Sequence, residues 1–267
     1  MIMRKALLGF ALSLVLGNEI VVAADYDKGL KAYESGDYAT ALSEWTPLAN
    51  GGDAKTQFSL GQMMRMSRRS FETRETGIEW ITKAAEQGFI DAQYQLGEYH
   101  FVHGPSEKSA FWFIKSAEQG HIMGQQWAGS FYADGFDGIL KNSKTAVKWY
   151  TLAGEQGDAA SQQYLGEAYS LGIGVLKDDK KAVKWFLKAA KQGASRSQFN
   201  LGASYYNGTG VFKNNVLSYM WFSLADFNED YNAGAKRDFV AKSMDSSQIA
   251  KAQEMSSRCL ASDYTDC

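Results

Sequence analysis

Apolar residues along this chain recur at the three- and four-residue spacing of an amphipathic helix, in near-copies of one string. The string KAVKWFLKAAKQG fills 181–193, and close relatives of it fill 76–88, 108–120 and 145–157. Each copy sets an apolar stripe against a polar face and ends in Gln-Gly, where glycine favours the left-handed turn that stops a helix. The pattern predicts a series of equivalent helices, which we call helix B.

Two independent markers follow one period. Tryptophan recurs at gaps of 35, 32, 37, 36 and 36 residues from Trp45 to Trp221. A Leu-Gly or Ala-Gly pair recurs at gaps of 36, 32, 37 and 36 residues from Gly61 to Gly202. A repeat of this length indicates a solenoid, because one helix pair cannot bury its apolar face alone. The chain is therefore predicted to be all-α: a right-handed α/α solenoid of about six helix-pair repeats with C-terminal capping helices.

Each unit places another helix, helix A, before helix B. In the last unit we expect helix A at 195–208 and helix B at 216–227. Paired glycines such as Gly208 and Gly210 mark the loop between them, where the chain needs positive φ. The glycine after leucine lies inside helix A, where it costs about 1 kcal/mol relative to alanine. We therefore expect close helix–helix approach at this glycine, and we expect the periodic tryptophans to pack in the core between units.

Residues 1–24 have the organisation of a secretory signal peptide. A positively charged start and an apolar run at 6–16 precede small residues, which predicts cleavage after Ala23 or Ala24. The apolar run is too short to span a bilayer, so a retained membrane anchor is the less favoured alternative. No stable membrane insertion is expected once the signal is removed.

The repeat solenoid is expected to cover 25–229, followed by capping helices and a tail at 230–267. Asp245 and Gln248 have the three-residue spacing of a capping box, which predicts the start of a helix. The apolar stripe of that helix would cover the open end of the stack.

Charge and cysteine content narrow the classes of partner and compartment. A formal net charge of −2 provides no electrostatic case for a nucleic-acid partner. The only cysteines are Cys259 and Cys267, whose spacing permits a disulfide that would hold the tail in an oxidising compartment. The alternative is two separate thiols near the C-terminus.

The order of residues within each unit resembles the Sel-1-like repeat family of α/α solenoids, which is related to tetratricopeptide repeats. That order is Leu-Gly, then Tyr, then Gly-x-Gly-Val, then Ala, Trp and an ending like KAAEQG; the similarity covers about 55–224. The resemblance implies an exported bacterial adaptor that binds other proteins, and it implies no activity. The loops after Gly61, Gly97 and Gly129 depart from the family pattern, so each is a candidate for a particular role.

Helical phase identifies the face of helix A that would line the concave groove of a solenoid. Relative to the glycine, this face carries positions −2 and +1. The candidate partner-binding residues at these positions are Gln95, Glu98, Trp127, Tyr164, Glu167 and Asn200. Trp127 lies outside the tryptophan register, and with Tyr164 it would form an exposed aromatic anchor for a protein partner. The alternative is that Trp127 fills a local gap beside the Ala-Gly pair of its own unit.

A second candidate surface is basic. Arg65, Arg68, Arg69 and Arg74 surround the first irregular loop, where they would dock an acidic partner or an anionic envelope surface. The alternative is an ordinary solvated loop.

The sequence carries no convincing catalytic or cofactor motif. His100, His103 and His121 have spacings that can hold a metal, but no cysteine or suitably spaced carboxylate joins them, so no metal is expected. Neither Gly-x-Ser-x-Gly nor Ser-x-x-Lys occurs, and the glycine loops lack the third glycine of a dinucleotide fingerprint. A cysteine-rich branch of the resembled family is linked to β-lactam binding, but this chain lacks its paired cysteines.

These observations favour a non-enzymatic protein-binding adaptor or scaffold, periplasmic or secreted, with no cofactor. The first alternative is a secreted effector that contacts a host. The second alternative, an enzyme, is a hydrolase of cell-wall or β-lactam substrates, which would need a nucleophile and a base that converge in the groove.

Overall fold

The computed structural model describes residues 24–66, 71–136 and 138–267, and the secondary structure of these residues is helical throughout apart from one isolated bridge. The predicted signal peptide lies outside the described residues. The helices are α1 (Tyr26–Glu34), α2 (Tyr38–Asn50), α3 (Ala54–Met66), α4 (Phe71–Glu86), α5 (Ile90–His103), α6 (Ser106–Glu118), α7 (Ile122–Asp134), α8 (Ser143–Glu155), α9 (Ala159–Leu171), α10 (Asp179–Ala190), α11 (Ser195–Asn207), α12 (Asn215–Phe227), α13 (Ala233–Ala241) and α14 (Ser246–Ala261).

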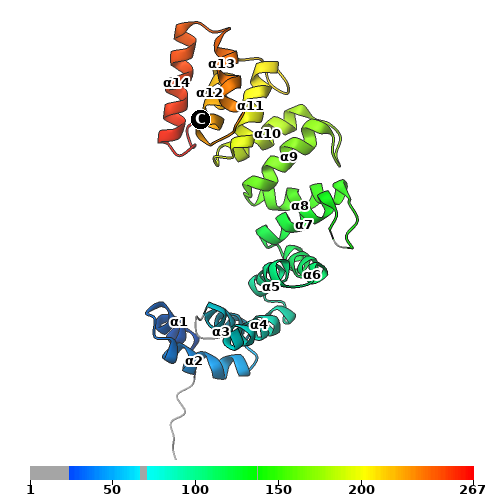
Figure 1. Ribbon diagram of the computed structural model, residues 1–267, viewed down its shortest axis with the longest axis vertical. Helices are drawn as coiled ribbons and strands as arrows, with labels where there is room; N and C mark the ends of the chain where they lie inside the picture. Colours follow the sequence, from blue (N-terminus) through cyan, green and yellow to red (C-terminus); the bar gives the residue numbers. More distant parts are fainter. Residues whose placement is uncertain (1–23, 67–70, 137) are drawn as a thin grey trace, which may run out of the picture.

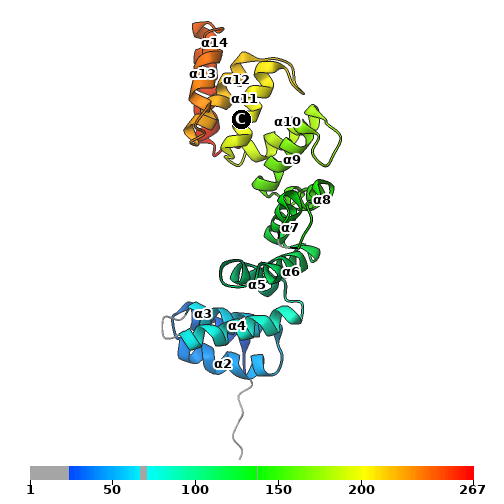
Figure 2. The same cartoon turned by 45° about the vertical axis from the view of Figure 1, so that its right-hand side comes forward.

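Helices α1 to α12 form six successive antiparallel pairs, and each pair packs on the next (Figures 1 and 2). The stack curves into an open arc, with α1 and α2 at one end. Helices α13 and α14 pack against α12 at the other end, and Asp245 and Gln248 form both bonds of the predicted capping box at the start of α14. The predicted all-α solenoid of six helix pairs with C-terminal capping helices is therefore confirmed.

The internal glycines of helix A lie against helix B, as their position in the sequence predicts. A Cβ added to Gly97, Gly166 or Gly202 would collide with the ring of Phe113, Phe186 or Phe222 respectively. These phenylalanines are the residues that follow the periodic tryptophan, and they are buried. Glycine is thus required because the ring occupies the space that any other side chain would need.

The periodic tryptophans are less deeply buried than expected. Trp45 and Trp221 are fully buried, whereas Trp80, Trp112, Trp149 and Trp185 are only partly buried. In the first unit the Trp45 indole itself lies against the helix-A glycine, Gly29. In the later units the residue after the tryptophan points at that glycine, so the indole lies about 100° away on the helix, towards the seam between units. Trp80, Trp112 and Trp185 each pack there on the core of the preceding unit.

Buried glutamines link the units to one another. The amide of Gln162 in α9 donates to the backbone carbonyl of Gly154 in α8 at 2.9 Å, and its oxygen accepts from Gln192 at 2.8 Å. The same arrangement recurs along the stack as Gln57–Gln87, Gln93–Gln119, Gln125–Gln156 and Gln198–Asn228. The glutamine of each Gln-Gly ending therefore forms part of the inter-unit contact.

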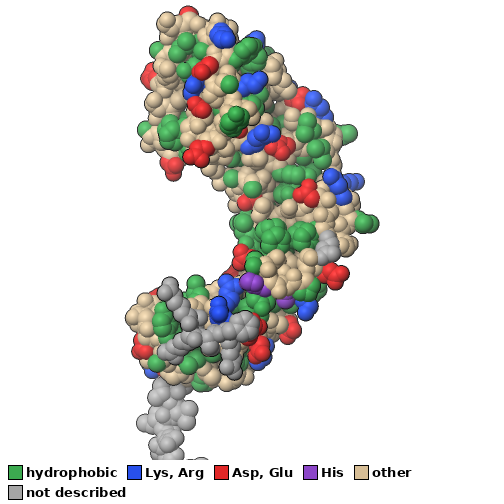
Figure 3. Space-filling view, viewed as in Figure 1, with side chains coloured by type: hydrophobic (Ala, Val, Ile, Leu, Met, Phe, Trp, Pro, Cys, Tyr) green, Lys and Arg blue, Asp and Glu red, His purple; other side chains and the backbone are tan. Residues whose placement is uncertain are grey.

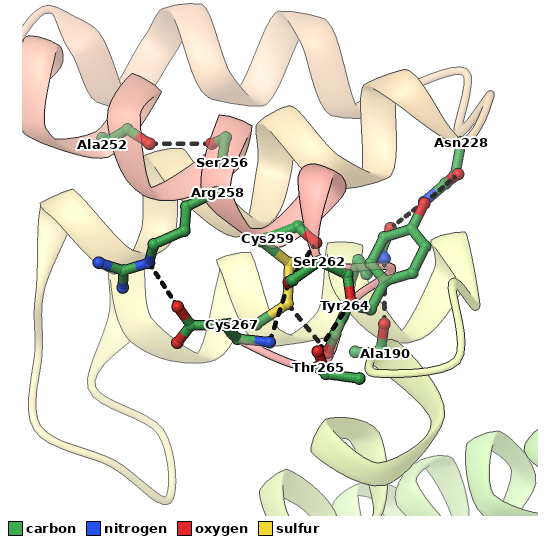
Figure 4. Close-up of a disulfide and its surroundings, with 12 residues drawn as sticks. Ala190, Asn228, Ala252, Ser256, Arg258, Cys259, Ser262, Tyr264, Thr265 and Cys267 are labelled. Carbon is green, nitrogen blue, oxygen red and sulfur yellow. Dashed lines mark hydrogen bonds and ion pairs between the residues drawn. A yellow bond between two sulfur atoms is a disulfide. The ribbon is translucent and has the colours of Figure 1, made fainter.

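The C-terminal tail closes this glutamine series. Cys259 and Cys267 form a disulfide, and Cys259 is buried in the core that contains Trp221 (Figure 4). The disulfide folds the tail back so that the Tyr264 hydroxyl donates to the side-chain oxygen of Asn228 at 2.8 Å. The tail thus packs on the core that α10, α11 and α12 share.

Candidate functional site

The arc is hollowed on one side, which lies at the left of Figure 3. Helix A of one unit contacts helix A of the next, as α7 does with α9 and α9 with α11. Equivalent helices lie closest together on the inner side of a curved stack, so helix A lines the hollow. Helix A also carries the predicted partner-binding residues at positions −2 and +1.

Trp127 lies partly buried among aromatic rings from three elements. Its indole stacks on Phe113 of α6 at a centroid distance of 5.1 Å, and it contacts Phe131 of its own helix at 5.8 Å. Phe101, in the last turn of α5, lies 4.8 Å from the indole on a further side. The Trp127 ring therefore fills a gap between units as well as contributing to the surface.

The residue that presents this cluster to solvent is Phe101, which the sequence analysis did not single out. Its side chain is 47% exposed, and the adjacent Val102 is 69% exposed. Phe136, from the irregular loop after α7, stacks on Phe131 at 4.4 Å and on Phe101 at 6.3 Å. We call Phe101, Val102, Trp127 and Phe136 the aromatic patch. In Figure 3, hydrophobic side chains gather across the middle of the arc.

Polar groups border the aromatic patch. Tyr94 donates a hydrogen bond of 3.0 Å to Glu98, and its ring stacks on His121 at 4.3 Å. Burial and the adjacent Glu98 carboxylate raise the pKa of Tyr94 to about 12, and the Trp127 indole acts in the opposite direction. Tyr94 therefore remains a neutral donor, and Glu98 is an exposed carboxylate beside the aromatic patch.

Tyr164 belongs to the next unit and does not stack on Trp127. Its ring stacks on Tyr150 of α8 at a centroid distance of 4.0 Å, just as Trp127 stacks on Phe113. Position −2 of helix A therefore packs on helix B of the preceding unit. Burial raises the pKa of Tyr164, and nearby acidic groups raise it further.

The remaining groove candidates are partly exposed polar residues. Glu167 lies 3.9 Å from the Arg196 guanidinium of α11. Gln95 and Asn200 are half-buried, and the Gln95 side-chain oxygen is enclosed without a hydrogen-bond partner. The structure thus distributes these candidates along helix A of successive units.

Two of the four basic candidates, Arg65 and Arg74, are among the described residues. Arg65 ends α3 with a partly exposed side chain, and Arg74 is exposed on α4. Arg68 and Arg69 lie outside the described residues.

The histidines have roles in packing and capping. His121 accepts the Gly124 N–H at 3.1 Å and so caps α7, while burial lowers its pKa against the raising effect of Asp91 and Glu98. Burial also lowers the pKa of His100. Across the described residues, no three or more histidine, cysteine or carboxylate side chains are grouped as metal ligands would be. Within those same residues, no helix has the length and apolarity needed to cross a membrane.

Comparison with solved structures identifies close architectural relatives. A Sel1 repeat protein from Oxalobacter formigenes has a TM-score of 0.72 and 25% identity, covering 88% of this chain and 99% of the other. A protective antigen of uropathogenic Escherichia coli with an SLR fold has a TM-score of 0.71 and 29% identity, covering 88% of this chain. This chain spans only 53% of the Escherichia coli protein. No curated protein sequence matches.

Five successive segments match the family model described as Sel1 repeat. They cover 56–89, 90–121, 122–158, 159–193 and 195–225, and they coincide with helix pairs α3–α4 to α11–α12. The matched segments account for more than half of the chain. The chain therefore belongs to the Sel1 repeat family.

Proposed function

We propose that this Sel1 repeat protein is a non-enzymatic adaptor that binds a protein partner in the hollow of the arc, with the aromatic patch as the anchor. The observation that carries the proposal is the exposure of Phe101 and Val102, 47% and 69%, beside the half-buried Trp127. Exposed large apolar side chains that are supported by packed rings are typical of protein-binding anchors.

The polar groups at the border of the patch favour a partner segment that has apolar side chains next to a hydrogen-bond donor or a basic group. Glu98 supplies an exposed carboxylate beside the patch, and Glu167 in α9, 3.9 Å from Arg196, supplies a partly exposed one further along the stack. Charged groups at the rim of such an interface set partner choice more than affinity. Apolar side chains would bind against Phe101, and a cationic group would lie towards these carboxylates.

We further propose that the protein acts outside the cytoplasm, in the periplasm or after secretion. The signal-like sequence of residues 1–24 supports this location, and so does the Cys259–Cys267 disulfide, since disulfides persist in oxidising compartments. The related Escherichia coli protein is described as a protective antigen, which also suits a protein accessible from outside the cell.

The proposal is tested by affinity capture from envelope extract with Phe101→Ser/Val102→Ser beside the unaltered protein. Because both side chains are exposed, this variant should fold normally, which far-ultraviolet circular dichroism and the melting temperature would check. Phe111→Ser on α6 is a matched control, since Phe111 is 51% exposed and belongs to a helix B. We expect the unaltered protein and Phe111→Ser to capture the same partner, and the double variant to fail to capture it.

Two results would contradict the proposal. A partner captured equally by the double variant would place binding elsewhere, with Arg65 and Arg74 the next surface to mutate. Hydrolysis of a chromogenic β-lactam or of cell-wall material, abolished by a single substitution in the hollow, would favour the enzymatic alternative.

A further inference from the structure

We propose that the loops joining helix A to helix B in the last three repeats form a docking edge for anionic phospholipid bilayers. Three side chains, which we call the tip row, carry this inference: Leu140, Leu176 and Phe212. They are 85%, 91% and 96% exposed, among the largest exposures of apolar side chains in the described residues. Single exposed apolar residues are ordinary, but three at the same position of successive repeats are not explained by chance exposure.

Each member of the tip row lies in the same local sequence. A β-branched residue precedes it and packs into the core of the unit, and a lysine with an exposed side chain follows it. The three segments are Ile139–Lys141, Val175–Lys177 and Val211–Lys213. The partly buried residue packs against a core cluster and so sets the direction of the next side chain, which leaves the apolar tip pointing outward beside a positive charge.

A backbone hydrogen bond ties the described part of each tip loop to helix A. In each loop a backbone N–H returns to the end of helix A: Asn142 to Tyr132 at 2.7 Å, Asp178 to Tyr169 at 2.9 Å, and Asn214 to Tyr205 at 2.8 Å. These bonds fasten the segment that directly follows each tip to the end of helix A. The tips are therefore presented rigidly, and binding would cost little conformational entropy in the loop.

Consecutive loops also rest on one another. A Cβ on Gly174 would collide with the Ser143 carbonyl at the start of α8, and a Cβ on Gly210 would collide with the Asp179 carbonyl at the start of α10. The loops after α9 and α11 thus each pack on the preceding unit directly after that unit's own loop. In both Figure 1 and Figure 2 the loops after α7, α9 and α11 project from the same side of the molecule. The tip row is therefore continuous along one edge.

The chemistry of the edge indicates a bilayer as its occupant. The tip side chains are almost fully exposed, so the protein itself provides little apolar surface around them. A binding partner must therefore provide the apolar environment. The lysine beside each tip would be attracted to negatively charged groups at the surface of that apolar environment. An anionic bilayer provides both, because acyl chains lie directly below phosphate headgroups.

Two neighbouring features add to this surface. Beside Phe212 lies an open pocket of about 750 Å³, which is separate from the hollow of the arc. Lys180 and Lys213 line this pocket and could bind a headgroup phosphate. At the middle tip, Leu171 and Ile173 are 69% and 40% exposed and enlarge the apolar area. Lys177 there lies 3.6 Å from Asp179, so the positive charge is strongest at the two outer tips.

The test is flotation with vesicles of phosphatidylglycerol and phosphatidylcholine, compared with vesicles of phosphatidylcholine alone. The protein is purified from the cells that make it, and its N-terminus is determined by mass spectrometry. Leu140→Ser/Leu176→Ser/Phe212→Ser removes the tip row. A control variant, Leu42→Ser/Phe227→Ser/Tyr231→Ser, removes three other exposed apolar side chains. A third variant, Lys141→Gln/Lys177→Gln/Lys213→Gln, removes the charges.

We expect the unaltered protein and the control variant to bind anionic vesicles equally, and the tip-row variant to bind at least about tenfold more weakly. The lysine variant should lose up to about fivefold for each charge, and high salt should reproduce that loss. Failure of the unaltered protein to bind anionic vesicles, or equal binding by the tip-row variant, would overturn the proposal. Self-association or a protein partner that depends on the tip row, without vesicle binding, would overturn it too.

Discussion

At the scale of single residues, the repeat depends on a glycine in helix A and a buried side chain in helix B. The contact recurs from Gly61 against Ile81 to Gly202 against Phe222, so the two helices of a unit approach as closely as their backbones allow. Because the ring occupies the space of the missing Cβ, the mid-helix glycine is more favourable here than alanine. Glycine therefore recurs in the sequence because a helix-B side chain occupies the space that a Cβ would need.

Gly166→Ala tests this requirement. Alanine gains about 1 kcal/mol from helix propensity, but the added methyl would collide with the Phe186 ring, and overpacking of this kind costs about 1–3 kcal/mol. We expect a net loss of stability in urea denaturation. The double variant Gly166→Ala/Phe186→Leu should recover part of the loss, whereas strictly additive effects would show that the two residues are not coupled.

A second residue-scale prediction concerns pH. The Lys28 side chain and the Asp25 backbone N–H both donate to Glu44, and these hydrogen bonds hold the pKa of Glu44 below its ordinary value of 4.5. Because the folded-state pKa is the lower one, this stabilisation is fully present above pH 4.5 and is lost as the pH falls below it.

Glu44→Gln should accordingly lower the urea midpoint at pH 7, and the variant and the unaltered protein should converge below pH 4.5. Glu254→Gln, an exposed site on α14, serves as the control and should leave the profile unchanged. A constant difference between Glu44→Gln and the unaltered protein at every pH would refute the assignment.

At the scale of elements, the glutamine series connects each helix pair to the pair before it. Each buried helix-A glutamine donates to a carbonyl of the preceding helix B and accepts from the glutamine or asparagine that follows its own helix B. A solenoid has only nearest-neighbour interfaces, so a polar contact repeated at every interface contributes to each of them. Asn228 and Tyr264 end the series at the C-terminal cap.

Gln162→Leu should lower the free energy of unfolding by about 1–3 kcal/mol, because it removes one buried and one partly buried hydrogen bond and leaves the Gln192 amide with fewer partners. The adjacent Gln163→Leu is the matched control, since Gln163 is partly exposed and makes only a 3.4 Å contact with Glu167. It should change stability by no more than about 0.5 kcal/mol. Equal effects of the two substitutions would show that the glutamine series does not stabilise the interface.

At the scale of the whole molecule, the arc offers two surfaces with different chemistry. The aromatic patch lies beside the exposed Glu98 carboxylate, and we propose that it anchors a partner in the hollow, whereas the A–B loops of the last three units carry apolar tips with lysines. The repeat explains both, because equivalent positions of successive units fall in rows along the stack. A protein of this form would hold a partner in its hollow while its loop edge rests on a bilayer.

The fold was predictable from sequence because the helix pairs, their order and the cap all follow from local pattern. The positive φ of Gly172, Gly174, Gly208 and Gly210 was predictable for the same reason, since turn geometry is local. The aromatic patch was only partly predictable. Helical phase places Trp127 near the groove, but Phe101 and Phe136 reach it from another helix and from an irregular loop. Such contacts depend on how the units are stacked, which no periodicity in one helix specifies.

The most direct test of the central claim is photo-crosslinking in living cells from position 101. Phe101 is replaced by p-benzoyl-phenylalanine, and Phe111 is replaced in the same way on the opposite helix of that unit. We predict a discrete crosslinked protein from position 101 that is absent from position 111. Adducts of equal size and yield from both positions, or an adduct from position 111 alone, would contradict binding in the hollow of the arc.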